Sequence, residues 1–316
     1  GRGEGNDHGE ALFHDSGRRI AMIVRICGAL LLLCWQSLGF AVSVTDDAGQ
    51  VVALSRPAQR IVSLAPHLTE ILFAVGAGSR VVGVAQYSDY PSAAKKLPRI
   101  GGYEQADLEA VIGLHPDLIV AWQSGNNAGQ IAQLKQLGFP VYLSEPRHIT
   151  DVAASMERIG ALAGGGAQAA RAVRDFRSRH ARLQAQYAGR APVRAFYEVW
   201  NRPLMTVNGA HLIGDVMKLC GAANVFAGLP VPTPTISEEA VLVADPQVII
   251  ASGMDEARPA WLDEWRRWPR MKAVKAGHLY FVPPDILQRP GPRILDGAER
   301  LCALVDRARR APGARN

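Results

Sequence analysis

Short apolar runs alternate with helical patterns along most of the chain. The runs at residues 60–65, 81–84 and 117–121 are almost continuously apolar, which is typical of strands that are buried on both faces of a sheet. Helical patterns at 108–114 and 130–137 follow strands of this kind. The alternation predicts an α/β lobe with a parallel sheet over residues 57–148.

The strand pattern stops at residues 149–190, where only helical periodicity remains. Apolar residues recur there at steps of three and four, at Val173, Phe176, His180, Leu183 and Tyr187. This spacing places them on one stripe of a long helix. Strands and helices alternate again over residues 191–310. We therefore expect two Rossmann-like lobes with parallel-type sheets, joined by one long helix.

An internal repeat supports two similar lobes. Residues 110–121 align without gaps with residues 240–251, at an offset of 130, as expected for duplicated units. Glu109 and Glu239 precede the two copies at the same offset. The helix dipole favours an acid in the first turn of a helix, but it does not account for the matching offset.

The N-terminal segment, residues 1–41, has the pattern of an export signal. Arginines precede an apolar run of about ten residues that begins at Ile26, and small residues lead to Ala41. A bilayer crossing needs about 20 apolar residues. We expect upstream sequence before a start at Met22, a cleaved signal peptide, and a mature protein in the periplasm.

The composition excludes disorder and argues against a nucleic-acid partner. Hydrophobic residues make up 48% of the chain and charged residues 20%, which suits a folded protein. The net charge of +6 is spread thinly, whereas nucleic-acid-binding domains concentrate basic residues in a patch. Removal of the signal leaves Cys220 and Cys302, which could form one disulfide in an oxidising compartment or remain two buried thiols.

Common catalytic and metal-binding signatures are missing. No G-x-S-x-G, H-E-x-x-H or P-loop motif occurs, and no two histidines of the mature chain have metal-ligand spacing. We expect neither catalysis nor a resident cofactor or metal. An exported α/β enzyme that acts on a cofactor-like substrate remains the alternative of a different class.

Several aromatic residues follow predicted strands. The carboxyl ends of parallel strands face the ligand crevice of an open α/β sheet, and rigid aromatic faces can hold a large ring system there. Each of these residues could also be an ordinary packing residue. The candidates at this edge are Tyr87, Tyr103, Trp122 and Trp200, with His67 at a strand–helix junction and Asp285 and Arg289 as polar anchors.

Three motifs resemble those of a known family. They read Ser-Leu-Ala-Pro at 63–66, Tyr-Ser-Asp-Tyr-Pro at 87–91, and Ala-Trp at 121–122 with Gly-Asn at 125–126. The chain is similar to the periplasmic vitamin B12-binding proteins of ABC importers, within the class III periplasmic binding proteins, whose two lobes are joined by a single helix. Siderophore and haem receptors share the broader superfamily, so a haem or ferric-siderophore binder is the alternative within the same fold.

The resemblance implies a monomeric receptor that carries cobalamin, or a related corrinoid, as its transported ligand. It implies ligand contacts at Tyr87, Tyr103, Trp122, Asp285 and Arg289, although Tyr103 and Thr233 stand where those receptors have tryptophan. It further implies a disulfide between Cys220 and Cys302. Finally, it implies that Glu109 and Glu239 dock on a permease dimer at the inner membrane.

Overall fold

The computed structural model describes residues 41–253 and 257–310. The predicted signal peptide therefore lies, apart from Ala41, outside the described residues. From Val42 onward the described residues belong to one compact unit. Within that part of the chain, none of the helices combines the length and hydrophobicity that a bilayer crossing requires.

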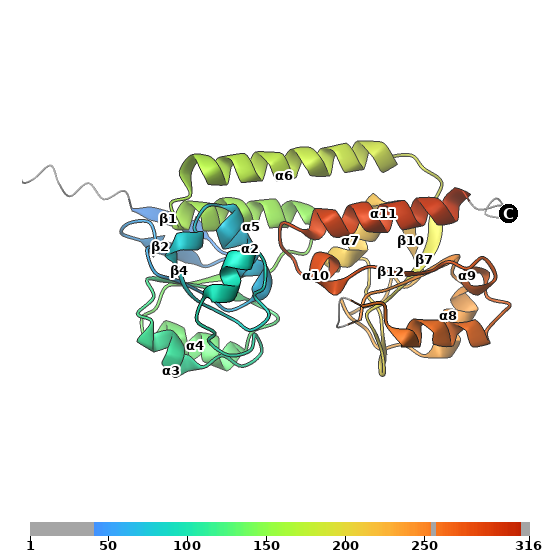
Figure 1. The fold of residues 1–316 in the computed structure, drawn as a ribbon, viewed down its shortest axis with the longest axis horizontal. Coiled ribbons are helices and arrows are strands. Elements are labelled where there is room, and N and C mark those ends of the chain that lie inside the picture. Colours follow the sequence, from blue (N-terminus) through green and yellow to red (C-terminus); the bar gives the residue numbers. More distant parts are fainter. Residues whose placement is uncertain (1–40, 254–256, 311–316) are drawn as a thin grey trace, which may run out of the picture. The chain divides into compact units, whose positions relative to one another are not determined.

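The N-terminal lobe is built on a parallel four-stranded sheet with the order β4-β3-β5-β6 (Figure 1). Apolar clusters cover both faces of this sheet, as its continuously apolar strands predicted. The strands are β3 (Ile61–Ser63), β4 (Val81–Val84), β5 (Leu118–Trp122) and β6 (Val141–Ser144). The helices are α2 (Pro66–Ala74), η2 (Gly78–Arg80), η3 (Ser92–Lys96), α3 (Leu108–Gly113) and α4 (Ala128–Gln136).

An antiparallel hairpin precedes this sheet, formed by β1 (Val42–Thr45) and β2 (Val51–Leu54). The sequence pattern did not predict it, because each strand has only four residues. The Asp47 N–H donates to the carbonyl oxygen of Leu143 at 3.0 Å, and β1 packs on the helix α5 (Ile149–Leu162). The hairpin therefore extends the N-terminal lobe beyond its predicted start at residue 57.

The C-terminal lobe repeats the topology of the first. Its parallel sheet has the order β10-β7-β11-β12, so in both sheets the second strand along the chain lies at one edge, followed by the first, third and fourth. The strands are β7 (Val193–Glu198), β10 (Ala222–Asn224), β11 (Val248–Ala251) and β12 (Leu279–Phe281). A small antiparallel pair, β8 (Trp200–Asn201) and β9 (Leu204–Met205), follows β7.

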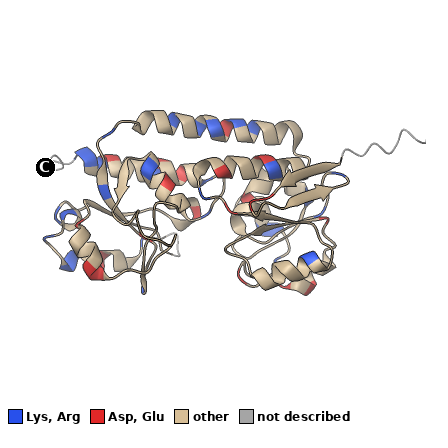
Figure 2. Ribbon diagram, turned by 180° about the vertical axis from the view of Figure 1, so that it is seen from behind, with Lys and Arg blue, Asp and Glu red and all other residues tan. Residues whose placement is uncertain are grey.

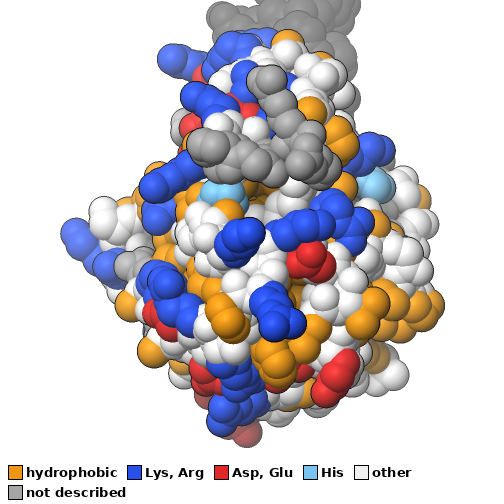
Figure 3. Space-filling model, turned by 90° about the vertical axis from the view of Figure 1, so that its right-hand side faces the viewer, with side chains coloured by type: hydrophobic (Ala, Val, Ile, Leu, Met, Phe, Trp, Pro, Cys, Tyr) orange, Lys and Arg blue, Asp and Glu red, His pale blue; other side chains and the backbone are white. Residues whose placement is uncertain are grey.

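Helices again cover this second sheet. They are α7 (Leu212–Leu219), α8 (Glu238–Ala244), η4 (Ala260–Arg267), α9 (Lys272–Lys275), α10 (Pro284–Leu287) and α11 (Ile294–Arg310). The repeated sequence segments correspond to α3 with β5 and to α8 with β11. Over a face of this lobe, Lys and Arg side chains lie spread out, with acidic and apolar side chains between them (Figure 3).

The long helix predicted between the lobes is α6 (Gly166–Tyr187). Most of its apolar stripe is buried, at Val173, Phe176, Leu183 and Tyr187, whereas arginines recur along the rest of the helix with Asp175 as its one acidic residue (Figure 2). The segment 149–190 also contains α5, which packs alongside α6 (Figure 1).

α5 and α6 run in opposite directions. α5 begins beside the C-terminal lobe, where the Ile149 N–H donates to Asp215 Oδ2 at 2.9 Å, and ends where the Leu162 carbonyl oxygen accepts from Ala58. The turn before α6 passes close to α2, because a Cβ on Gly165 would lie 2.2 Å from the carbonyl oxygen of Val75. Only glycine leaves room for this approach.

One apolar core connects the two lobes. It runs from β3 and β5 through helices α2, α5, α6, α7 and α11 to β7 and β11, whereas the outer face of each sheet has a separate cluster. Cys220 and Cys302 are fully buried in the shared core and form the expected disulfide between the end of α7 and α11. Side chains of both lobes therefore pack in a single cluster.

Candidate functional site

Three rings meet at the carboxyl end of β5. The Trp122 and Tyr103 ring centroids are 6.1 Å apart, and the His67 ring meets Trp122 edge-on at 5.3 Å. The Trp122 indole lies directly over Gly125, where a Cβ would come within 1.9 Å of the ring. Glycine at position 125 is therefore required for this position of the indole.

Asn126 ties the surrounding loops together. Its Oδ1 accepts from the Trp122 N–H at 2.6 Å, and its Nδ2 donates to the carbonyl oxygens of Leu64 at 2.9 Å and Tyr103 at 2.5 Å. One side chain thus links the ends of β3 and β5 to the loop that carries Tyr103. Burial, together with the neighbouring Glu104 carboxylate, raises the pKa of the Tyr103 hydroxyl, so Tyr103 stays neutral.

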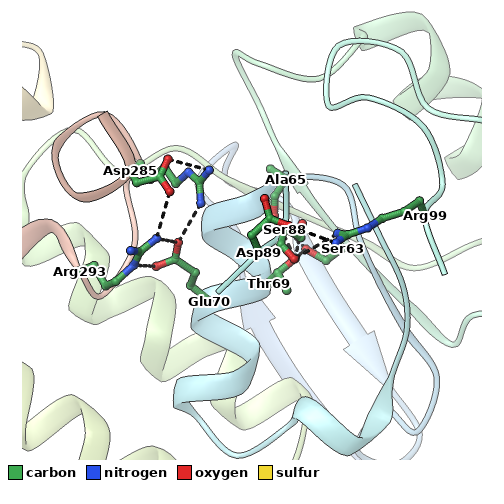
Figure 4. A network of polar contacts seen from close by, with 10 residues as sticks. Ser63, Ala65, Thr69, Glu70, Ser88, Asp89, Arg99, Asp285 and Arg293 are labelled. Carbon is green, nitrogen blue, oxygen red and sulfur yellow. Dashed lines mark hydrogen bonds and ion pairs between the residues drawn. The ribbon is translucent and has the colours of Figure 1, made fainter. Parts of the chain in front are cut away.

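Tyr87 lies in the turn after β4, with its side chain 64% exposed. Its φ of +63° is in the left-handed region, which is unfavourable for a bulky residue. Polar contacts hold this turn (Figure 4). Arg99 donates to the carbonyl oxygens of Ala85 and Ser88, and Thr69 Oγ1 donates to Ser88 Oγ at 3.1 Å. A turn fixed in this way can present an exposed tyrosine without help from its own packing.

His67 is buried in the first turn of α2, with 2% of its surface exposed. Burial, and to a lesser extent the charge of Arg289, lower the pKa of His67 to about 3, so the imidazole is neutral at physiological pH. Within residues 41–253 and 257–310, its Nε2 finds no hydrogen-bond partner. Among the described residues, no three His, Cys, Asp or Glu side chains gather as a metal site would require.

The predicted polar anchors Asp285 and Arg289 form an ion pair, with Arg289 Nη2 2.9 Å from Asp285 Oδ1. Arg289 also reaches across to Glu70 of α2, where its Nη1 is 3.4 Å from Oε1. Arg293 binds Glu70 through two nitrogens, at 2.8 and 2.7 Å (Figure 4). The C-terminal lobe therefore brings Arg289, paired with Asp285, to the helix that also carries His67.

Sequence reasoning did not select Glu70, although a signal for it exists. It is the one acidic residue in the apolar helix α2, and a buried carboxylate needs a charged or hydrogen-bonding partner. Asn126 belongs to the motif at residues 121–126, but the motif alone did not indicate a structural role for its side chain. The contacts of both residues are visible only once segments far apart in the sequence are brought together.

Trp200 belongs to a second aromatic pair, in the C-terminal lobe. Its ring meets Trp261 at 6.4 Å, and its Nε1 donates to the carbonyl oxygen of Arg202. Nearby, the buried Glu198 accepts a hydrogen bond from Trp265 Nε1 at 2.8 Å and lines a cavity of about 260 Å³. Contacts among the described residues thus connect Trp200 with the C-terminal lobe alone.

Glu109 and Glu239 are both exposed and occupy the first turns of α3 and α8. A capping side chain precedes each helix, since Asp107 accepts from Ala110 and Ser237 from the Ala240 N–H. Both helices pack on the sheet faces that point away from α5 and α6. The two acids therefore occupy equivalent places in the two lobes.

Comparison with known proteins agrees with this architecture. A sequence model of the family described as periplasmic binding protein matches residues 61–286. The vitamin B12-binding protein of Vibrio cholerae serotype O1 is 39% identical over 250 residues, which cover 79% of this chain and 90% of that protein.

Solved structures show the same relationship. The periplasmic vitamin B12 binding protein BtuF of Vibrio cholerae has a TM-score of 0.75 at 37% identity, covering 81% of this chain and 99% of that one. A periplasmic heme binding protein from Pseudomonas aeruginosa has a TM-score of 0.68 at 25% identity, covering 78% and 92%.

These matches confirm the expected fold of two α/β lobes and the expectation of a binding protein in place of an enzyme. They also confirm the resemblance that the three motifs indicated. The chain belongs to the periplasmic binding protein family.

Proposed function

We propose that this protein captures cobalamin, or a closely related corrinoid, and delivers it to an ABC importer. The observation that carries the proposal is the group of Tyr103, Trp122 and His67 rings at the end of the N-terminal sheet, with Asp285 and Arg289 of the other lobe joined to the same helix. The relatives named as vitamin B12-binding proteins support this ligand class.

The proposed binding requires no covalent bond between the protein and its ligand. A corrin is a large, mostly apolar ring system with amide side chains at its edge, so aromatic faces can bury the ring while polar groups contact the amides. The hydrogen bonds of Asn126 and the packing of Trp122 over Gly125 order this surface before a ligand arrives. Preordering lowers the entropy cost of binding.

Tyr87 is assigned to the same surface, because its turn leaves the carboxyl end of β4, the neighbour of β3 in the parallel sheet. Trp200 fits less well, because it pairs with Trp261. We keep it as a contact for the ligand's edge, reached from the C-terminal lobe.

Delivery would follow export and removal of residues 1–41, leaving a monomeric receptor in the periplasm with corrinoid as its cargo and without a resident cofactor. Glu109 and Glu239 would dock on arginines of the two permease subunits at the inner membrane. The equivalent positions of these acids in a repeated fold suit a dimeric transporter, because charge complementarity sets register and encounter rate.

Calorimetric titration of the processed protein with cyanocobalamin, haemin and a ferric siderophore tests the ligand. We expect saturable one-to-one binding of cyanocobalamin alone. The similarity to a haem-binding protein makes haem the second candidate, and saturable haemin binding without a cobalamin signal would establish it in place of the first.

A further inference from the structure

The segment between α10 and α11 lies directly on α2. Its Gly291 is so close that a Cβ there would lie 3.3 Å from both the Cβ and the carbonyl oxygen of His67. Arg289 and Arg293, on either side, both reach Glu70, which is one helical turn after His67. The segment of the C-terminal lobe that carries the predicted anchor Arg289 is therefore seated on the N-terminal lobe's first helix.

Glu70 is the centre of this contact. Its side chain is 2% exposed, against 17% for each arginine, and it holds Arg293 through two parallel hydrogen bonds. Paired bonds of this kind fix orientation as well as distance. The Arg293 guanidinium also lies 4.2 Å from the centre of the Tyr90 ring, so two residues of the N-terminal lobe hold it from different directions.

The charges in this group balance. Glu70 and Asp285 supply two negative charges, and Arg289 and Arg293 supply two positive ones. Arg289 is shared, with a short contact to Asp285 and a longer one to Glu70. If Glu70 were neutral, Arg289 would be drawn toward Asp285 alone, and Arg293 would lose its bidentate partner.

We propose that Glu70 is a positioning residue for ligand binding: it orients Arg289 and, through Arg293, fixes the spacing of the two lobes without touching the ligand itself. This inference rests on the proposed function for its effect on ligand affinity. Its effect on lobe spacing does not depend on that function.

The variant Glu70→Gln keeps the shape of the side chain and removes its charge. We expect the Kd for cyanocobalamin to rise about tenfold or more, because a buried charge pair loses one partner. The control is Glu299→Gln, which removes the same charge from a more exposed ion pair with Arg179 between α11 and α6, and which should leave the Kd unchanged.

A second measurement separates positioning from a general loss of structure. Spin labels on cysteines introduced at the exposed positions Gln136 and Lys275 report the distance between the lobes in ligand-free protein. We expect Glu70→Gln to broaden or shift this distance distribution while Glu299→Gln keeps the original one. In a double-mutant cycle, Glu70→Gln and Arg293→Gln should be strongly non-additive.

An unchanged distance distribution together with an unchanged Kd in Glu70→Gln would overturn the inference. So would additive effects of the two substitutions. If the original protein bound no corrinoid, the proposed function would fail, yet the spin-label distances would still decide whether Glu70 fixes the lobes.

Discussion

Trp122 shows how closely a single side chain depends on its neighbours. The indole can lie flat only because residue 125 has no side chain, and its backbone N–H is held by Asn126. The spacing Trp-x-x-Gly-Asn thus encodes a ring orientation as well as a family resemblance. Gly125 leaves space for the indole, Asn126 connects the loops by hydrogen bonds, and Trp122 supplies the apolar face.

Trp122→Ala should weaken cyanocobalamin binding by about 1–3 kcal/mol, because the aromatic area available to the ligand is lost. Calorimetry measures the change. Trp268→Ala, at an exposed tryptophan of the C-terminal lobe, serves as the control and should bind normally. Unchanged affinity in Trp122→Ala would remove this residue from the binding surface.

The buried carboxyl of Glu198 should make the free energy of unfolding depend on pH. Burial raises the pKa of its carboxyl from 4.5 to about 8, so the folded protein keeps a proton that the unfolded chain releases between these values. Below pH 4.5 this carboxyl is protonated in both states and does not reduce the free energy of unfolding. Between pH 4.5 and pH 8 it lowers the free energy of unfolding by about 1.4 kcal/mol per pH unit.

Glu198→Gln should therefore be more stable than the original protein at pH 8 and similar to it at pH 4.5. Urea denaturation at several pH values measures this difference. The exposed Glu157→Gln is the control and should follow the original curve. Parallel curves for Glu198→Gln and the original protein would mean that Glu198 does not titrate in this range.

How much could be predicted differs from residue to residue. Trp122 and Tyr103 were predicted from their places near strand ends and in motifs, and the structure brings their rings together. Trp200 also follows a strand, but it belongs to the β8–β9 hairpin and no helix follows it directly. Its ring packs against Trp261. Glu70 depends on arginines about 220 positions later in the chain, and local patterns carry no information about such partners.

At the scale of elements, the continuous apolar strands and the stripe on α6 were reliable signals, because the strands are buried on both faces of a sheet and the stripe is the buried side of a helix. The short hairpin β1–β2 was missed, since its alternation extends over only four residues per strand. α5 was predicted as helical, but its reversal against α6 brings Gly165 close to Val75 at the end of α2, and this contact between distant segments has no local signature.

The disulfide links two of these elements. Cys220 ends α7 and Cys302 lies within α11, at a sequence separation of 82. Replacing both by alanine should lower the free energy of unfolding by about 4 kcal/mol, because the unfolded chain gains freedom when a loop of this length is opened. Urea denaturation checks the value, and an unchanged midpoint would contradict it.

At the scale of the whole molecule, the two lobes repeat one topology, and the repeat was visible in the sequence through residues 110–121 and 240–251. The fold class and the equivalent positions of Glu109 and Glu239 in the two lobes could thus be predicted. The contact between the segment 289–293 and α2 could not, because it exists only once both lobes are assembled.

Replacing Glu109 and Glu239 with alanine should abolish corrinoid uptake and leave Kd unchanged, since both side chains are exposed and lie on helices that cover the outer sheet faces. Uptake of labelled cobalamin by cells that carry the cognate importer measures the effect. Alanine at Glu157 and Asp175, exposed acids of α5 and α6, is the control. Normal uptake by the first double variant would rule out the docking role.

The core that passes through α2, α5, α6, α7 and α11 serves both sheets at once. Each lobe completes its larger apolar cluster with side chains of the other, so we expect fragments made by cutting the chain between the lobes to be less stable than the intact protein. We therefore expect the two lobes to unfold together in one transition, even though each has its own sheet of the same topology.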